Sequence, residues 1–381
     1  MFTKKNESFV LLVLLGASAT AQGQSLLPEA YDALQNKTRI SGVIMLDYAL
    51  QDGINRESDE SSAEFNSEIR RARLDVKHKL KKNWAAKLQI GFDEEQSSSE
   101  MGDVYIRHKN RKKVAITMGR FKEPFGLENT TSSKHITFLE RAMVSKALSP
   151  GRNTGLMVAA TPSNFTWAFS LMDIESQEKD SAPFSLGARL TWAPINNEWQ
   201  SLHFGFSASL REMDGEVFEI KERAEIHSAD KIIESGEIAV DQMQLLGVEL
   251  AFLNGSFSYQ GEYMSADIQA VDAGEDAVFD GFYVQAGYFL SGDTYQYKNG
   301  ELVGVQPTSS EGAWELACRY SVLNTRESTE GSKLKTSTLG LNYYYDKNIR
   351  LTTNLLYSQS SEAVNASEDG AGVAFRAQYL F

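Results

Sequence analysis

The stretch Gly372-Val-Ala-Phe-Arg-Ala-Gln-Tyr-Leu-Phe381 ends the chain and decides its fold class. Its odd-numbered positions from Val373 to Phe381 are apolar or aromatic, whereas Arg376 and Gln378 occupy even-numbered positions. A period of two predicts a β-strand with two different faces. A soluble sandwich would rarely end on an exposed Phe, but a membrane barrel places such faces in lipid and in a watery lumen, with the aromatic residue at the interface. The segment therefore favours a transmembrane β-barrel.

The N-terminus has the pattern of a secretory signal peptide over residues 1–21. A basic region with Lys4 and Lys5 precedes the apolar stretch Phe9 to Leu15 and the A-x-A site Ala19-Thr20-Ala21. No later stretch approaches about 18 uninterrupted apolar residues, as a membrane-spanning helix requires. Residues 22–38 are expected to be a short periplasmic segment, in which Leu26 to Lys37 has the pattern of a short amphipathic helix. An exported, aromatic-rich chain without a helical span indicates the Gram-negative outer membrane.

Residues 39–381 divide into sixteen alternating segments, each near the length that a tilted strand needs to cross a bilayer. They lie at about 39–49, 67–79, 84–93, 102–109, 113–121, 153–161, 164–173, 184–193, 200–212, 241–252, 256–266, 280–291, 312–322, 335–346, 348–359 and 370–381. We expect an all-β fold, an antiparallel transmembrane barrel of 16 strands with short periplasmic turns and long extracellular loops. An even number of strands places both termini on the periplasmic side.

The connections after the even-numbered segments are short, as periplasmic turns should be. They include Leu80 to Asn83, Pro162-Ser163 and Lys347. The exception is Gly292 to Glu311, which is long although its position makes it periplasmic. Either this turn folds into the lumen, or the strand count is wrong by one hairpin.

Charge is distributed unevenly. The net charge is −13, and removing Lys4, Lys5 and Glu7, which together contribute +1, leaves −14 for the mature chain. Strand alternation nevertheless points more basic than acidic residues into the lumen. The basic set is Arg71, Arg73, Lys77, Lys79, Lys87, Arg107, Arg189, Arg211, Arg319, Arg350 and Arg376, and the acidic set is Asp47, Asp75, Asp93, Asp103, Glu249, Glu262 and Glu315. The wall is either an anion path or simply the polar lining that any water-filled barrel needs.

The segment 122–152 carries an excess of basic residues, among them Lys122 and Arg141. Prolines and glycines at its ends are typical of a loop with fixed entry and exit turns. Its middle, Ile136 to Leu139, is too apolar for a solvated outer loop. We therefore expect this loop to pack inside the barrel and to constrict the pore.

Motifs in the first third of the barrel resemble those of the phosphate-selective porin O and P family. They are Arg70-Arg71-Ala72-Arg73-Leu74, Asp103-Val104-Tyr105-Ile106, Gly119-Arg120-Phe121-Lys122-Glu123-Pro124-Phe125-Gly126-Leu127-Glu128, Thr131-Ser132-Ser133-Lys134, Ile136-Thr137-Phe138-Leu139-Glu140-Arg141 and Pro150-Gly151-Arg152. Gly312 to Ala317 resembles a later strand of the same family.

The resemblance implies a sixteen-stranded, homotrimeric channel in which the third loop, the fifth loop and a long periplasmic turn fold into the lumen. It also implies an anion-binding constriction, because guanidinium and hydroxyl groups can replace the hydration shell of phosphate. The implied members are Arg70, Arg71, Asp103, Ser132, Ser133 and Arg141. Strand alternation and loop charge add Arg73 and Lys122 to this candidate site. Alternation by itself points Arg71 and Arg73 inward and does not assign Arg70.

The fifth-loop region departs from the family pattern, because Arg211 to Glu225 is rich in Glu where the phosphate-selective members have closely spaced arginines. An acidic approach repels phosphate, so a general non-specific porin remains the alternative. The partners expected are small anions such as phosphate, outer-membrane lipid and lipopolysaccharide, without nucleic acid.

An enzyme is not expected, although a barrel hydrolase and a plugged adhesin are other classes to consider. His135, near Ser132 and Ser133, is the only catalytic candidate among the five histidines. No metal or cofactor motif occurs. The lone Cys318 is expected to be a small lipid-facing residue rather than a reactive thiol.

Overall fold

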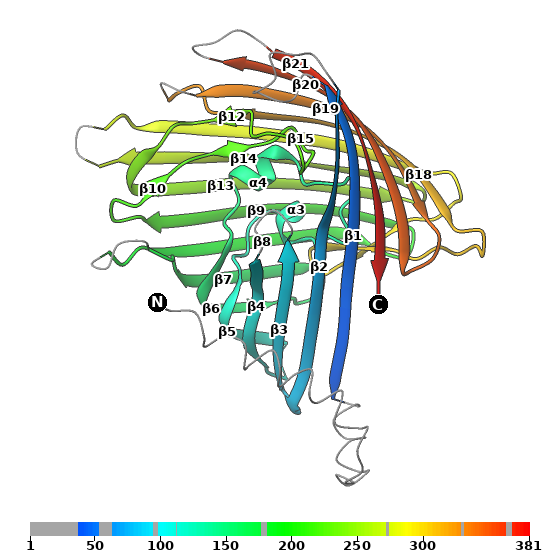
Figure 1. Ribbon diagram of the computed structural model, residues 1–381. Helices are drawn as coiled ribbons and strands as arrows, with labels where there is room; N and C mark the ends of the chain where they lie inside the picture. The colour runs from blue at the N-terminus through cyan, green and yellow to red at the C-terminus, as the bar shows by residue number, and fades with distance from the viewer. Residues whose placement is uncertain are drawn as a thin grey trace, which may run out of the picture. The chain divides into compact units, whose positions relative to one another are not determined.

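The fold is a closed antiparallel β-barrel (Figure 1). The computed structural model describes residues 37–52, 63–93, 98–111, 113–176, 181–271, 274–328, 331–362 and 368–381. The expected signal peptide, residues 1–21, and residues 22–36 of the expected periplasmic segment lie outside the described residues.

Sixteen strands form the barrel, and every predicted strand is confirmed. They are β1 (Thr38–Asp52), β2 (Glu64–Lys81), β3 (Trp84–Asp93), β4 (Ser98–Lys109), β5 (Val114–Lys122), β6 (Arg152–Ala160), β7 (Phe165–Asp173), β8 (Phe184–Asn196), β9 (Gln200–Glu212), β13 (Ile238–Asn254), β14 (Phe257–Ala270), β15 (Ala277–Phe289), β18 (Ala313–Asn324), β19 (Ser332–Tyr344), β20 (Ile349–Glu362) and β21 (Glu368–Leu380). Each pairs with its neighbours along the chain, and β1 pairs with β21 to close the ring, blue beside red in Figure 1.

The last residue completes the closure. The Gly42 amide donates to the Phe381 carbonyl oxygen at 2.9 Å, and the Phe381 amide donates back to the Gly42 oxygen at 3.2 Å. A Cβ at residue 42 would lie 2.3 Å from Cζ of Phe381. Only glycine therefore leaves room for the terminal ring against β1.

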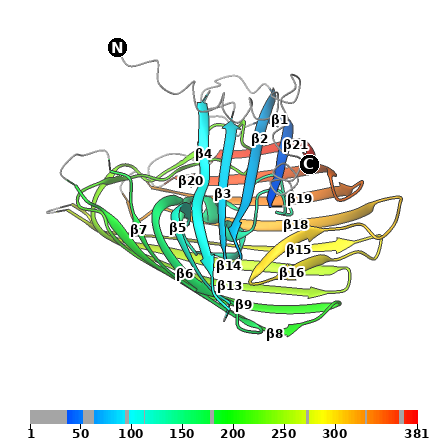
Figure 2. The same cartoon turned by 90° about the horizontal axis from the view of Figure 1, so that it is seen from below.

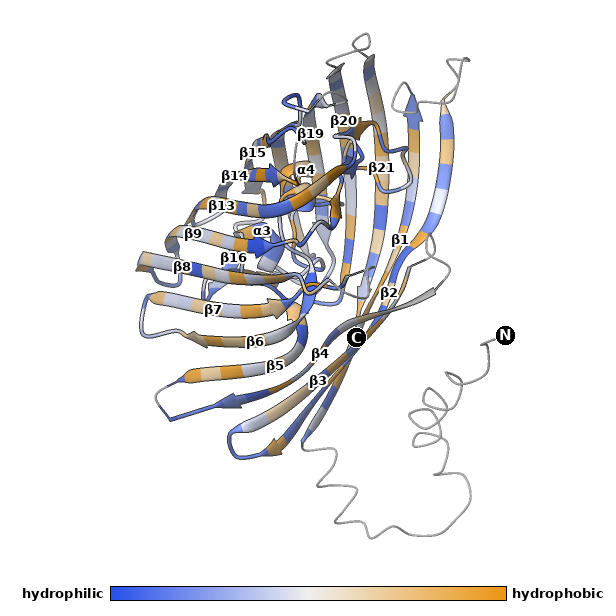
Figure 3. Cartoon of the chain, turned by 90° about the vertical axis from the view of Figure 1, so that its left-hand side faces the viewer, coloured by the Kyte–Doolittle hydropathy of each residue, from blue (hydrophilic) through white to orange (hydrophobic). Residues whose placement is uncertain are grey.

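The two faces of β21 behave as its alternation predicts. Phe375 and Tyr379 are 36% and 48% exposed on the outer wall, whereas Arg376 is 1% exposed inside. Figure 3 shows orange and blue bands alternating along the strands. Because a membrane barrel meets hydrocarbon outside, the exposed apolar side chains form its lipid-facing surface. The exposed Cys318 lies on this outer surface, as expected.

Replacing Leu355 with Arg should destabilise the barrel by about 2–4 kcal/mol, the cost of a cation on the lipid face near the bilayer midplane. Leu355 is 53% exposed on the outer wall of β20. Denaturant unfolding in lipid vesicles measures the difference, with Leu355→Phe as the control that keeps the position apolar. Equal unfolding midpoints for the two variants would mean that Leu355 does not face lipid.

Three connecting segments fold into the lumen. The third outer loop, L3 (residues 123–151), carries the helices α3 (Leu127–Thr130) and α4 (Met143–Ala147). The fifth, L5 (residues 213–237), carries the short strands β10 (Val217–Phe218), β11 (Lys221–Glu222) and β12 (Ile233–Glu234). The inward turn (residues 290–312) carries β16 (Tyr295–Lys298) and β17 (Glu301–Val305). None of the helices in the described part of the chain is long and apolar enough to cross a membrane.

L3 and L5 build an apolar core against one side of the barrel. Helix α4 contacts β14, β15 and β18, and Figure 1 shows α4 lying across the sheet there. The core includes Met143 and Val144 from L3, Ile226 and Ile233 from L5, and Phe279 from the wall. The inner face of these strands is thus partly apolar, because the inserted loops cover this side.

The inward turn explains the one connection that breaks the length rule. The strand count holds, and the turn bonds to inward-facing residues instead of extending away from the barrel. The Arg189 Nη2 donates to the Gly300 oxygen at 2.9 Å, and the Tyr295 hydroxyl donates to Glu315 at 2.9 Å. Helix α3 of L3 contacts β17 of this turn. The turn therefore reaches the same level of the lumen as L3.

Candidate pore constriction

Glu140 fastens L3 to the wall on both sides of the barrel closure. Its carboxylate accepts from Arg70 Nε at 2.8 Å and Nη2 at 3.2 Å, and from Arg376 Nη2 at 3.0 Å. Arg376 also bonds both oxygens of Asp47, at 2.7 and 2.6 Å. Burial opposes ionisation of Glu140, but Arg70 and Arg376 outweigh it and hold its pKa well below the usual range. The carboxylate stays ionised and keeps the loop in place.

A second anchor joins L3, L5 and β18. Arg319 donates to Glu128 of L3 at 3.2 Å and to Glu225 of L5 at 2.5 Å, and its guanidinium lies 4.4 Å from the centre of the Phe138 ring. Glu128 also accepts from the Ala142 amide at 3.0 Å. Burial raises the pKa of Glu128 despite the charge of Arg319. Two loops far apart in sequence therefore share one buried arginine.

The basic wall is only partly available to solutes. The inward arginines of β8, β18, β20 and β21 are at most 5% exposed, because L3, L5 and the inward turn cover them: Arg189, Arg319, Arg350 and Arg376. Arg189 is bidentate to Glu249, at 2.8 and 2.7 Å, and Arg211 pairs with Glu123 of L3 at 3.1 Å. These residues face inward, as alternation predicts, but many of them hold the inserted segments and are not open to the passage.

Half-buried and exposed inner residues are concentrated on β2–β5 instead. Arg71, Arg73 and Asp75 are half-buried, and Lys77 and Lys79 are exposed. Lys79 pairs with Ala85 of β3, and Ala85 pairs on its other side with Arg107 of β4. Successive inward residues lie about 6–7 Å apart along β2, so its basic residues form a row on the inner face. The open passage therefore runs beside β2–β5.

Arg70 is the inward residue that alternation could not assign. Ile69 is 49% exposed on the outer wall, and Ala72 pairs with the outward Phe92. Between them, Arg70 bonds Glu140, and Arg71 lies within electrostatic range of Glu140 and Arg141. Two consecutive arginines thus face the lumen, where strict alternation allows one.

Arg71, Arg73, Lys122 and Arg141 come together where L3 leaves β5. Lys122 Nζ donates to the oxygen and to Oδ1 of Asn129, at 2.8 and 2.9 Å. Arg141 donates from Nε to the Glu128 oxygen at 2.9 Å and from Nη2 to the Thr131 oxygen at 2.7 Å. Among the residues that the structure describes, the Arg71 side chain makes no hydrogen bond, and neither Arg71, Lys122 nor Arg141 makes an ion pair. These four residues are here called the basic cluster.

Asp103 is held between two cations on the same side of the lumen. Its Oδ1 accepts from Arg152 Nε at 2.7 Å, and its Oδ2 accepts from Lys87 Nζ at 2.6 Å. Lys87 also pairs with Asp75 at 3.3 Å. Arg152 is the site residue that sequence reasoning missed, although Pro150-Gly151-Arg152 marks the exit of L3. It lies within electrostatic range of Lys122 and Arg141.

Ser132 and Ser133 follow Thr131, whose carbonyl oxygen accepts a hydrogen bond from Arg141. Ser132 is exposed, whereas Ser133 is buried, and its hydroxyl has no hydrogen-bond partner among the described residues. The Thr131 hydroxyl is buried and unpartnered in the same way. The structure therefore brings the seven predicted residues Arg70, Arg71, Arg73, Lys122, Ser132, Ser133 and Arg141 to L3 and the facing strand, with Asp103 joined through Arg152.

His135 is oriented toward the inward turn and not toward the serines. Its ring lies against Gly304, where an added Cβ would come within 2.5 Å of Nδ1. Burial, with Lys134 and Arg350 nearby, lowers the pKa of His135 to about 4. Within the described residues no hydrogen bond joins its ring to Ser132 or Ser133. A neutral, weakly basic ring in this position is poorly suited to activate a hydroxyl.

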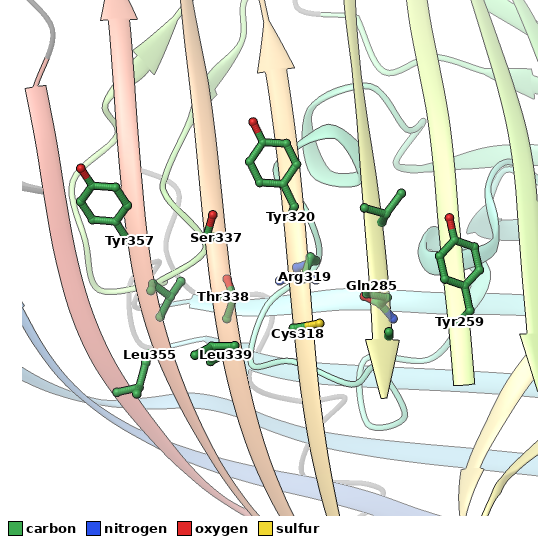
Figure 4. A pocket seen from close by; sticks show the side chains of 13 residues that line it. Tyr259, Gln285, Cys318, Arg319, Tyr320, Ser337, Thr338, Leu339, Leu355 and Tyr357 are labelled. Carbon is green, nitrogen blue, oxygen red and sulfur yellow. The ribbon is translucent and has the colours of Figure 1, made fainter. Parts of the chain in front are cut away.

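One hollow lies on the outside of the barrel, away from the passage. It measures about 470 Å³ and is lined by outward residues of β14, β15 and β18–β20, including Cys318, Tyr320, Leu339 and Tyr357. Figure 4 shows these side chains along neighbouring strands. Its lining is apolar, and it faces hydrocarbon, so it has no part in the path of an ion.

A sixteen-stranded barrel with an outer loop folded into a basic lumen defines an outer-membrane porin. The chain belongs to the phosphate-selective porin O and P family, whose model matches residues 39–381. Its channel is located in the Gram-negative outer membrane, as the sequence predicts.

Individual relatives agree with the family. Porin O of Pseudomonas aeruginosa is 26% identical over 393 residues, covering 90% of this chain and 88% of that protein. The fold is similar to that of an anion-selective porin from Comamonas acidovorans, with a TM-score of 0.59, 12% identity and coverage of 90% and 99% of the two chains. Pseudomonas putida OprB gives a TM-score of 0.62 at 10% identity, covering 93% of this chain and 96% of that one.

Proposed function

We propose that this porin selects anions, with inorganic phosphate among its solutes, at a constriction formed by the basic cluster. The observation that carries the proposal is the position of the Arg71 guanidinium, which makes no ion pair with any described residue and lies within electrostatic range of Lys122 and Arg141. A passing anion can supply the missing counter-charge, and guanidinium and ammonium groups bind phosphate oxygens well. The porin from C. acidovorans bears a title that agrees with this selectivity.

The other candidate residues take supporting roles in this proposal. Arg70 fixes L3 through Glu140. Asp103 orients Arg152 and Lys87, because both of its oxygens already accept from these cations. Ser132 supplies an exposed hydroxyl next to Thr131, whose carbonyl oxygen accepts from Arg141, and Ser133 is a buried donor without a partner among the described residues. Guanidinium groups flanked by hydroxyl donors suit an oxyanion better than a halide.

The acidic fifth loop counts less against phosphate than its composition suggests. Glu225 is buried on Arg319 and Ser321, Glu222 pairs with Lys146 at 3.2 Å, and Glu219 pairs with Lys221 at 2.6 Å. These carboxylates are bonded within L3 and L5 or to the wall. The repulsion of an arriving anion is correspondingly reduced.

We further propose that residues 1–21 are removed on export, that residues 22–38 form a periplasmic segment and that residues 39–381 are the porin domain with its constricting loop 122–152.

Three copies should associate through their lipid-facing walls, since closed symmetry is the rule for oligomers. Lipid and lipopolysaccharide surround the trimer, and His135 takes no part in catalysis.

Reversal potentials in planar bilayers test the proposal. The wild type should prefer chloride over potassium despite its acidic net charge, because salt screens the outer carboxylates over roughly 10 Å while the constriction acts at contact. Added phosphate should lower the chloride conductance by occupying the basic cluster, and insertions should step in threes. A cation preference would reject the proposal, whereas anion preference without phosphate block would leave a general anion porin.

A further inference from the structure

The inward turn is fastened to the barrel on both sides of Glu301. On one side, Arg189 binds the Gly300 oxygen, and the Tyr297 hydroxyl bonds His203 Nδ1 at 2.7 Å, while His203 Nε2 lies 3.0 Å from Glu249. On the other side, Gly304 lies against the His135 ring of L3. The backbone that carries Glu301 is therefore held in a fixed position in the lumen.

The Glu301 carboxylate has charged neighbours but no bonded partner among the described residues. Glu301 is half-buried, and its side chain makes no hydrogen bond or ion pair with any of them. Its nearest charges come from three wall strands: Arg189 of β8, Arg107 of β4 and Lys122 of β5. Arg189 is already bidentate to Glu249. Burial raises the pKa of Glu301 against the pull of these cations.

The positions of its neighbours along the barrel axis place Glu301 just on the periplasmic side of the basic cluster. Lys122 belongs to that cluster, and Arg107 lies two residues from the periplasmic end of β4 at Lys109. Helix α3, the first helix of L3, contacts β17, which begins with Glu301. An anion that leaves the basic cluster toward the periplasm therefore passes this carboxylate.

We propose that Glu301 determines which anions leave the constriction, by opposing the basic cluster with a fixed negative charge on its periplasmic side. Conduction needs binding that is strong enough for entry and weak enough for release. A carboxylate on the periplasmic side of the basic cluster weakens the binding of every anion there. Its repulsion is twice as large for an anion of charge −2 as for one of charge −1. Singly charged anions are favoured over doubly charged ones. This inference rests on the proposed anion selectivity.

Glu301→Gln tests the inference through bi-ionic reversal potentials. Removing one negative charge should raise the sulfate-to-chloride permeability ratio by about threefold and the chloride-to-potassium ratio by more, because the latter changes for both ions. Glu311→Gln is the matched control, since Glu311 belongs to the same turn but is exposed outside the constriction. It should leave both ratios at the wild-type values.

Two further variants separate charge from shape. Glu301→Asp keeps the charge and should behave as the wild type, whereas Glu301→Ala should behave as Glu301→Gln. Heat modifiability on gels shows that each variant is folded. The inference is overturned if Glu301→Gln and Glu311→Gln give the same ratios, or if Glu301→Asp changes them as much as Glu301→Gln does. A wild type without anion preference would instead refute the proposed function.

Discussion

Arg71→Glu is expected to reverse the ion preference of the channel, from anions to cations. Arg71 is the member of the basic cluster that makes no hydrogen bond within the described residues, so its replacement changes charge without releasing L3. Even in water, unit charges roughly 8 Å apart interact by about 0.5 kcal/mol. The change of two charge units acts oppositely on anions and cations, so the anion-to-cation permeability ratio should fall by about tenfold or more.

The reversal potential under a salt gradient measures this ratio. Lys347→Glu provides the control, because it changes the net charge equally at an exposed periplasmic turn. Arg141→Glu should also lower the ratio, but it removes the bonds to the Glu128 and Thr131 oxygens as well. If Arg71→Glu matched Lys347→Glu, the selectivity would arise elsewhere than at the basic cluster.

The barrel could be predicted from sequence because each strand carries its own signal. The alternation in β21 specifies which residues face lipid, and the chain order of short and long connections specifies how strands pair. Neither inference needs knowledge of the rest of the chain. This is why sixteen strands were predicted within a few residues of their observed ends, and why Arg376 was correctly placed inside.

The partners of the inner residues were not predictable in this way. Glu140 and Glu225 belong to loops without a period, and their contacts with Arg376 and Arg319 span the fold. A count of inward charges therefore overestimated the basic surface open to water. The one sequence feature that could have indicated a buried ion pair is an acidic residue next to an apolar run, as Glu140 follows Ile136 to Leu139.

The pairing of Arg70 and Arg71 shows a limit of another kind. Alternation assigns consecutive residues to opposite faces, so a strand that sends both inward contradicts the rule at one place. The reason lies in L3, whose Glu140 accepts two hydrogen bonds from Arg70. A buried carboxylate needs such partners, and satisfying it outweighs the regular pleat.

Glu140→Gln should both destabilise the protein and raise its single-channel conductance. The substitution leaves Arg70 and Arg376 facing a neutral amide, and breaking a buried ion pair costs about 3–5 kcal/mol. L3 then retains the Arg319 anchor through Glu128 but loses its hold beside the β1–β21 closure. A loop fastened at fewer points constricts the passage less, so larger and noisier current steps are expected.

Denaturant midpoints and single-channel currents measure the two effects, with the exposed Glu275→Gln as the control. Because the folded pKa of Glu140 lies below its usual range, its stabilisation is complete above the unfolded value of about 4.3 and is lost only as pH falls through the folded pKa. The wild type should therefore keep its conductance at pH 5, where the variant is already altered. Identical midpoints and currents for Glu140→Gln and Glu275→Gln would show that L3 does not depend on this anchor.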